Sequence, residues 1–200
     1  DAVTKLKIRY RSIIAKYNNH KEDYNLISSP IELQFENIDK LFSAFEVTLE
    51  DNNYSECGKV VKALEDSIGN LELVINEAPA IILMGMKLIP AKMKDALNES
   101  LKMQKDGYNI EYLNIDYNIN ESKKKVDDIL ARLKVLNIVD STFDMKTMLN
   151  YFDDLFNEFD KERTSKKLFE DFIRTILVKT NKYEKISNDL TKKIEEFKYS

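Results

Sequence analysis

The residues of this chain that are able to do acid–base, nucleophilic or metal chemistry are few and widely spaced. There is one histidine, His20, and one cysteine, Cys57, among the 200 residues. This pair cannot supply the four ligands of a structural zinc site, and a single cysteine cannot form an internal disulfide. Both residues lie on apolar helix seams. We therefore expect His20 to be a hydrogen-bonded interface histidine and Cys57 to be a small buried hydrophobe rather than a redox thiol.

Carboxylate pairs are plentiful, but their spacing does not suit catalysis. Adjacent acids such as Asp127 and Asp128 point about 100° apart on a helix, so they do not share a site. The sequence has neither the Glu-x-x-His repeats of a di-iron bundle nor a glycine-rich phosphate-binding loop. We predict that the protein is not an enzyme and that it has no catalytic residues, no metal site and no cofactor.

One candidate for partner binding is the tyrosine-bearing loop at residues 107–114, taken together with Tyr117 just after it. It carries Tyr108, Tyr112 and Tyr117. These side chains form either an exposed recognition patch or a cover over the end of a helical bundle. The sequence does not separate these alternatives. The nearby run Lys123, Lys124 and Lys125 is short and typical of a solvated helix face.

A second candidate is the segment 78–90, which is apolar around most of a helix. That pattern indicates burial on several sides. We interpret the segment as a junction between two bundles, with Pro79, Ile82, Met86 and Pro90 as junction residues, in preference to a partner site. Its longest uninterrupted apolar run has nine residues. Because a membrane-spanning helix needs about 20, we expect none within this chain.

Composition defines the elements that must position these residues. The chain has only 4 Gly and 3 Pro, with 43% hydrophobic and 33% charged residues. So few turn-forming residues exclude β-sandwiches, barrels and Rossmann-type domains, and favour an all-α protein. A net charge of −4 gives no reason to expect a nucleic-acid partner. The charge is uneven, because residues 31–90 carry 4 basic and 11 acidic groups.

Apolar residues recur in steps of three and four along most of the chain, which is the seam of helices that pack on one another. The pattern predicts three helices in the first part (1–27, 30–51, 54–77) and three in the second (90–106, 114–136, 140–162). Pro79 predicts a helix end or kink at 77–79, and Gly107 predicts the end of a helix. Met93, Leu97 and Leu101 are expected to face inward. No Gly or Pro follows Gly107, so the last helix is able to run for about 60 residues.

Short breaks between long amphipathic helices favour antiparallel neighbours. We therefore predict elongated, tandem antiparallel three-helix bundles joined by long shared helices. The first bundle would span residues 1–78 and the second 79–165. The helix 166–200 would continue towards a further repeat.

Three marks in the chain, in the same order and spacing, resemble the septation ring formation regulator family (EzrA). The first is a helix, acidic turn, Asn-Tyr and returning helix at residues 41–57. The second is Glu-Ala-Pro at 77–79 followed by Leu-Ile-Pro at 88–90. The third is Lys-Asp-Gly-Tyr-Asn-Ile-Glu-Tyr-Leu-Asn-Ile at 105–115. The resemblance covers about residues 5–165.

That resemblance implies spectrin-like repeats, a cytoplasmic location at the membrane face of the division site, and binding to the tubulin-like division protein FtsZ and other division proteins. Membrane attachment would come only through a segment absent from this chain. We accordingly expect a non-enzymatic scaffold that restrains FtsZ ring assembly and organises septal proteins. Two alternatives are a passive helical spacer and a coiled-coil oligomerisation module without direct FtsZ contact.

Overall fold

The computed structural model describes residues 1–199, and within that range every regular element is helical. The prediction of an all-α protein is confirmed. In chain order the elements are α1 (Ala2–Asn19), η1 (Lys21–Ile27), α2 (Ser28–Glu50), α3 (Tyr54–Leu83), η2 (Met84–Leu88), α4 (Ile89–Lys105), η3 (Glu111–Leu113), α5 (Ile115–Leu133) and α6 (Ser141–Lys198). The chain divides into two compact units, Asp1–Phe152 and Asp153–Ser200. The repeat boundaries at 78 and 165 stay a prediction.

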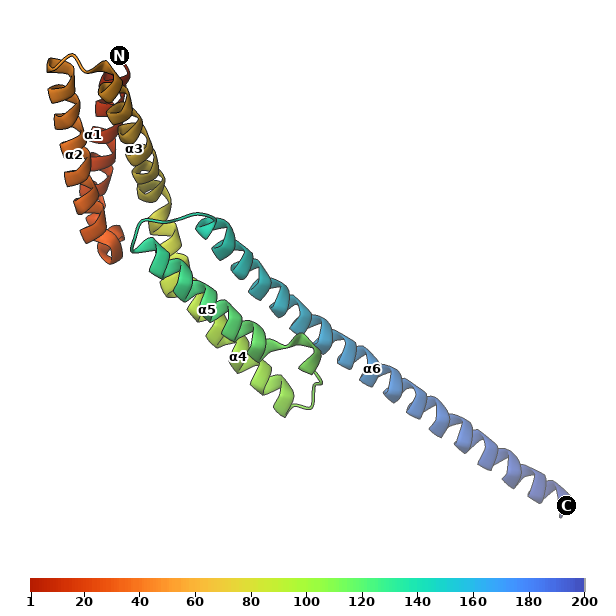
Figure 1. The fold of residues 1–200 in the computed structure, drawn as a ribbon. Helices are drawn as coiled ribbons and strands as arrows, with labels where there is room; N and C mark the ends of the chain where they lie inside the picture. Colours follow the sequence, from red (N-terminus) through yellow and green to blue (C-terminus); the bar gives the residue numbers. More distant parts are fainter. Residues whose placement is uncertain (200) are drawn as a thin grey trace. The chain divides into compact units, whose positions relative to one another are not determined.

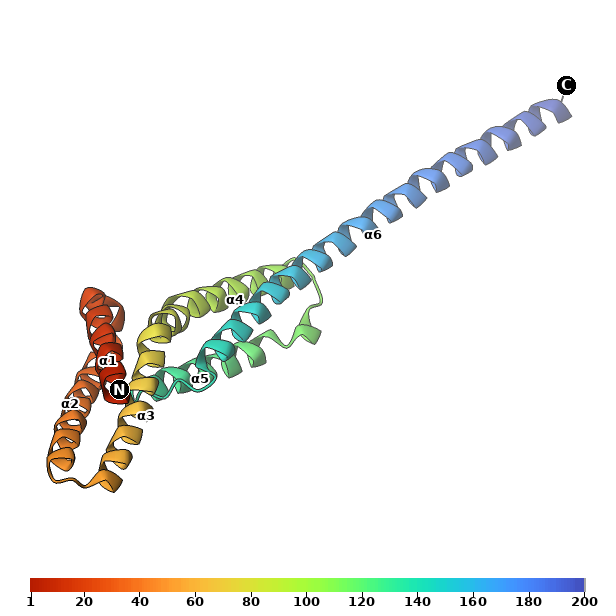
Figure 2. The ribbon, with the colours of Figure 1, turned by 90° about the horizontal axis from the view of Figure 1, so that it is seen from above.

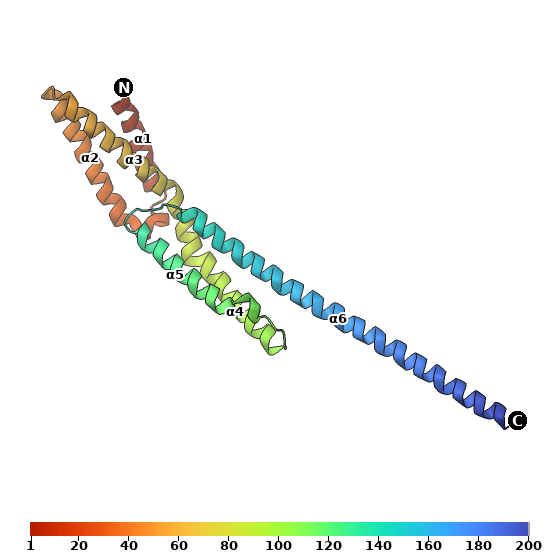
Figure 3. The ribbon, with the colours of Figure 1, turned by 45° about the vertical axis from the view of Figure 1, so that its right-hand side comes forward.

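In the first unit, α1, α2 and the first half of α3 lie side by side (Figures 1 and 3). The seam predicted for α3 is confirmed at Leu64, Ile68 and Leu71, whose side chains are fully buried. The helix begins at 54 as predicted, and the Asn53 side chain caps it by accepting a hydrogen bond from the Glu56 amide. Burial of this long apolar stripe is the main contribution that holds the three helices together.

The first helix ends earlier than the heptad pattern predicts. α1 stops at Asn19 and a 3₁₀ helix follows, so His20 lies at the break with an exposed side chain. The expectation of an interface histidine is therefore wrong, because the change of helix type rotates residue 20 off the seam. Tyr24 stays buried on the new turn. Cys57 is buried as predicted, and its Sγ lies 3.2 Å from the Thr48 hydroxyl.

Helix α3 passes through Pro79 without ending. Of the two outcomes predicted at 77–79, a helix end or a kink, the helix end is wrong, and the reason lies 51 residues away in the sequence. A kink stays a prediction. Proline has no N–H, so the carbonyl of Ile75, four residues earlier, loses its helical donor. The Tyr24 hydroxyl donates to that carbonyl at 2.7 Å in a buried position. A side chain from η1 thus replaces the missing helical hydrogen bond.

The helix widens instead at η2, a π-turn in which the Ile89 amide bonds to the Met84 carbonyl. A π-turn inserts one residue into the helical register. The buried face of α4 is consequently Ile89, Ala96, Ser100 and Met103. Leu97 and Leu101, expected to point inward, are exposed for this reason, and Met93 is half-buried.

The π-turn also changes the segment 78–90. Ala78, Ile81 and Ile89 are fully buried, as a buried junction requires. Of the four residues named as a junction, Pro79 and Ile82 are half-buried, while Met86 and Pro90 are exposed. Burial on several sides therefore holds for part of the segment only, and its role as a junction stays a prediction.

The second half of the first unit places α4, α5 and the start of α6 alongside one another (Figure 2). Gly107 ends α4 as predicted, with φ of 86° and a hydrogen bond from the Tyr108 amide to the Met103 carbonyl of 3.0 Å. From α6, Met145, Met148 and Phe152 are buried. The expected length of α6 is confirmed, because the helix has 58 residues.

In the second unit, Leu155 and Phe159 are buried, whereas every side chain from Lys167 to Tyr199 is exposed. The exposed residues include the apolar stripe that the sequence pattern marks, with Phe169, Phe172 and Ile176 at its start.

The continuous helix Tyr54–Lys105 is long and apolar enough to cross a membrane by length and composition, with a best window of mean hydropathy 1.5. Of that window, 39% is buried inside the structure. A helix at the core of a water-soluble protein has the same length and composition, so this is weak evidence for a membrane span.

Tyrosine hydroxyls tie the first helices together. Tyr10 donates to the Phe35 carbonyl at 2.9 Å and to Asp39 at 3.0 Å, and Tyr17 donates to Glu32 at 3.1 Å. Burial, followed by the hydrogen bond to Glu32 and its charge, raises the pKa of Tyr17 to about 12. Burial and Asp39 raise the pKa of Tyr10 further still. The neutral phenols are thus favoured in the folded state.

These shifts predict a loss of stability at alkaline pH. A phenol whose pKa is raised on folding contributes fully below its unfolded pKa of about 10 and loses that contribution as pH rises towards the folded value. Urea unfolding followed by circular dichroism should therefore show stability falling between pH 10 and 12. The Tyr10→Phe/Tyr17→Phe variant should show a shallower fall. Equal slopes for the two proteins would contradict this assignment, because lysine deprotonation is common to both.

Candidate functional site

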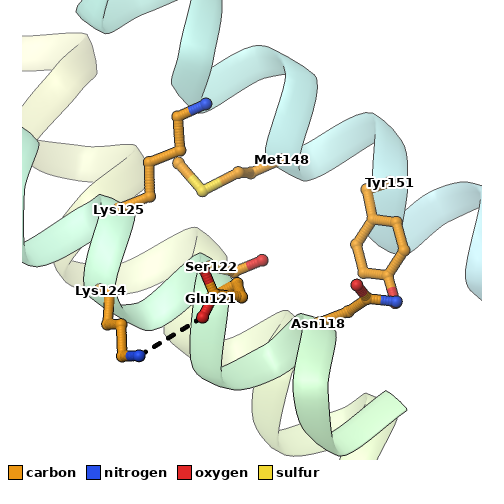
Figure 4. Close-up of a pocket in the computed structure, with 7 residues that line it drawn as sticks. All are labelled: Asn118, Glu121, Ser122, Lys124, Lys125, Met148 and Tyr151. Carbon is orange, nitrogen blue, oxygen red and sulfur yellow. Dashed lines mark hydrogen bonds and ion pairs between the residues drawn. The ribbon is translucent and has the colours of Figure 1, made fainter. Parts of the chain in front are cut away.

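One structural candidate for a binding site is a groove of about 440 Å³ between α5 and the start of α6 (Figure 4). We call it the α5–α6 groove. Asn118, Ser122 and Lys125 recur at helical spacing, so they share one face of α5, and Met148 and Tyr151 lie one turn apart on α6. Glu121 and Lys124 complete the lining from α5.

The charges at the rim of this groove are paired. Lys124 Nζ lies 3.4 Å from Glu121 Oε1, as Figure 4 shows, and Lys125 Nζ lies 3.7 Å from Asp144 Oδ1. Exposed pairs of this kind contribute little to stability, about 0–1 kcal/mol each. Either ammonium is therefore available to exchange its partner for an acidic group of a ligand at small cost.

Tyr151 is the most unusual group in the groove. Its hydroxyl oxygen is buried, and no hydrogen bond of good geometry reaches it from the described residues 1–199. Burial raises the pKa of Tyr151, and the Asn118 side chain beside the hydroxyl acts in the opposite direction. Figure 4 shows the Asn118 amide and the Tyr151 hydroxyl facing each other across the groove. A polar group entering the groove would find a donor that is already dehydrated.

The groove offers hydrogen-bond donors around an apolar floor, which suits binding of a partner's side chains. Among residues 1–199, no group of three or more His, Cys, Asp or Glu side chains is placed to hold a metal ion. Sequence reasoning missed the groove. The only sequence feature that pointed to the groove was the polar series Asn118, Ser122 and Lys125 at i, i+4 and i+7. The same series is equally typical of a solvent-exposed helix face.

The tyrosines named from the sequence lie elsewhere. Tyr112 and Tyr117 are exposed and Tyr108 is half-buried, while Ile110 between them is buried and anchors the segment. Tyr117 borders a hollow of about 340 Å³ and Tyr108 a different one of about 480 Å³. The two hollows share Gln104, Ile110 and Glu111. The structure does not bring the three rings to one site, and their role in partner binding stays a prediction.

These features define a class: an all-helical chain whose grooves suit contacts with other proteins. The particular family follows from comparison with known proteins. The sequence model described as "Septation ring formation regulator, EzrA" matches residues 1–200, so this chain belongs to that family. The resemblance found in the three sequence marks is thereby confirmed. The family is named for regulation of septation, a step of cell division, and not for a catalytic activity.

Individual relatives are distant. A septation ring formation regulator EzrA of Staphylococcus epidermidis is 24% identical over 157 residues, covering 74% of this chain and 28% of the relative. One from Geobacillus sp. is 19% identical over 194 residues, covering 97% and 33%. One from Staphylococcus aureus is 19% identical over 167 residues, covering 84% and 30%. This chain therefore spans about a third of the length of the curated relatives it matches. No solved structure matches it.

Proposed function

We propose that this chain is a non-enzymatic scaffold segment of a bacterial division regulator, which contacts FtsZ, restrains assembly of the FtsZ ring and helps to organise septal proteins. The observation that carries the proposal is the family match over the whole of residues 1–200. The regulator would act on the cytoplasmic face of the membrane at the division site.

The mechanism follows from the helices. Residues 1–78 and 79–165 would form two spectrin-like three-helix repeats that share long helices, and 166–200 would continue into a further repeat. Repeats joined in this way form a stiff, quasi-linear support. The acidic segment 31–90 and the tyrosines at 108, 112 and 117 would then be presented to division proteins at fixed spacings.

Light scattering of polymerising FtsZ tests direct antagonism. Adding an excess of this chain should lower the plateau of scattering, because bound FtsZ is withheld from assembly. The variant Tyr108→Ser/Tyr112→Ser/Tyr117→Ser should restore part of the plateau, and Tyr54→Ser, which removes an exposed tyrosine from α3, should not. Identical curves with and without excess chain would contradict direct antagonism and leave the passive spacer.

An oligomerisation module is the second candidate, because α6 exposes an apolar stripe from Leu168 to Phe197. Such a stripe at coiled-coil spacing is able to pair with a second copy. Sedimentation equilibrium distinguishes the two: an obligate dimer favours the oligomerisation module, and a monomer at micromolar concentration favours a scaffold repeat.

A further inference from the structure

The connection between α5 and α6 runs beside α3 (Figures 1 and 3), and a separate hollow lies between the two. Its volume is about 310 Å³. We call it the α3 hollow, and it is lined by Asn70, Leu73, Glu77, Ile138, Val139, Asp140, Ser141, Thr142 and Phe143. It shares no residue with the α5–α6 groove.

The connection is fixed in place by hydrogen bonds to its neighbours. The Asn70 amide donates to the Leu136 carbonyl at 3.3 Å, and the Thr142 hydroxyl donates to Glu77 at 2.8 Å. The Arg132 guanidinium donates to the Val139 carbonyl at 3.0 Å. Leu136 and Asp140 nevertheless adopt left-handed φ values of 59° and 58°. A leucine rarely does so, and such strained positions gather at functional sites.

Three large apolar side chains are exposed to solvent on this connection, on the adjoining part of α3 and on the start of α6. Leu73 is 53% exposed, Val139 66% and Phe143 71%, and all three line the α3 hollow. Apolar groups gathered around a hollow in this way mark interaction sites. An aromatic ring beside a pocket is the kind of anchor that dominates binding energy at protein interfaces.

The wall of the hollow also holds an unused donor. Ser141 is completely buried, and its hydroxyl has no hydrogen-bond partner within residues 1–199. It is the first residue of α6, whose first i to i−4 bond joins the Asp144 amide to the Asp140 carbonyl at 2.8 Å. The amides of Thr142 and Phe143 precede that bond, so no helical carbonyl accepts from them. A peptide carbonyl would satisfy these donors.

The charge of the hollow selects among macromolecules. Glu77 and Asp140 are the two ionisable residues that line it, and both are acidic. Glu77 also lies in the acidic part of the chain, residues 31–90. Anionic lipid surfaces and nucleic acids would be repelled. A basic protein segment would be attracted.

We propose that the α3 hollow is a docking site for a short segment of a partner protein in which a lysine or arginine adjoins a bulky apolar residue. The apolar side chain packs on Phe143 and Leu73, the cation faces Glu77 and Asp140, and a backbone carbonyl accepts from the donors at the start of α6. This site is independent of FtsZ contact, so it stands or falls separately from the function proposed above.

The test is selection from a phage-displayed random heptapeptide library on the immobilised 200-residue chain, with subtraction on the Phe143→Ser variant. Enriched peptides should combine Lys or Arg with a neighbouring Leu, Ile or Phe. Labelled forms of these peptides should bind the unaltered chain at least about tenfold more tightly than Phe143→Ser, because an aromatic anchor is lost. Phe143 is mostly exposed, so its removal leaves folding intact.

Asp140→Asn tests the charge while keeping a residue that tolerates left-handed φ. It should weaken binding several-fold at low salt and reduce the salt dependence. The matched controls Tyr54→Ser and Asp127→Asn remove an exposed aromatic ring and an exposed carboxylate from other surfaces, and should leave the affinity unchanged. No enrichment over the Phe143→Ser background, a consensus without basic residues, or dimerisation of the chain that Phe143→Ser abolishes would each overturn the proposal.

Discussion

Replacing Tyr24 by phenylalanine should lower the free energy of unfolding by about 1–3 kcal/mol, which is large for the removal of one oxygen atom. The hydroxyl donates at 2.7 Å to the Ile75 carbonyl, and both residues are about 1% exposed. Pro79 has no N–H to offer that carbonyl. The variant therefore leaves a buried acceptor without a donor, and water cannot reach it to compensate.

A double-mutant cycle isolates the cause. In the Pro79→Ala background, the alanine N–H is able to bond to the Ile75 carbonyl in the ordinary helical way. The cost of Tyr24→Phe should then fall by about 1 kcal/mol or more, a coupling that only a shared partner produces. If the cost is the same in both backgrounds, Tyr24 acts through packing and not through this hydrogen bond.

Urea unfolding followed by circular dichroism measures these differences, and Tyr17→Phe is the matched control. Tyr17 loses a hydrogen bond to Glu32, whose side chain is 54% exposed. Water replaces that partner readily, so we expect a cost below about 1 kcal/mol. A control that destabilises as much as Tyr24→Phe would contradict the special role of the Ile75 carbonyl.

Local signals predicted most of the helix boundaries. Asn53 caps α3 and Gly107 terminates α4 at the expected positions, because both act through hydrogen bonds to residues within a few positions. The length of α6 also follows from the sequence, since neither Gly nor Pro occurs within it. Capping and helix termination, which act within one or two turns, can be predicted from a single sequence.

The errors have long-range causes. Pro79 was expected to end or kink a helix, but the helix does not end there, because a tyrosine far away in the sequence supplies the missing hydrogen bond. The inward face of α4 was assigned from the spacing of its own apolar residues, but the π-turn at Met84–Leu88 shifts the register and exposes Leu97 and Leu101. Neither event has a local sequence signature, because each depends on what packs against the helix.

The candidate binding surfaces also depend on long-range packing, so the sequence did not predict them. The tyrosines at 108, 112 and 117 form a set in the sequence, yet Tyr108 and Tyr117 border different hollows and Tyr112 lines neither of them. The α3 hollow combines Leu73 of α3 with Phe143 of α6, which are 70 positions apart. Exposure of Phe143 could not be predicted, because the same apolar spacing continues into residues of α6 that are buried.

The π-turn leads to the second large effect. Replacing Gly85 by leucine should lower the free energy of unfolding by about 1–3 kcal/mol or more, because the side chain has no room. A Cβ at residue 85 would lie 2.9 Å from Met145 Cε and 3.1 Å from Leu130 Cδ2. These are the ends of flexible side chains, so Gly85→Ala is partly accommodated. The further carbons of leucine would push α5 and the start of α6 away from the helix.

The other helical glycines provide the control, because the effect of a glycine-to-alanine substitution on stability depends on the space around the new Cβ. Gly58 and Gly69 lie in α3, outside the π-turn, and a Cβ at either position would meet nothing within 4 Å. Gly58→Ala and Gly69→Ala should therefore raise stability by up to about 1 kcal/mol, through helix propensity alone. Gly85→Ala should gain less than either, and Gly85→Leu should be the least stable of the series in urea. If all three alanine variants gain equally, the close approach of Met145 and Leu130 does not constrain the π-turn.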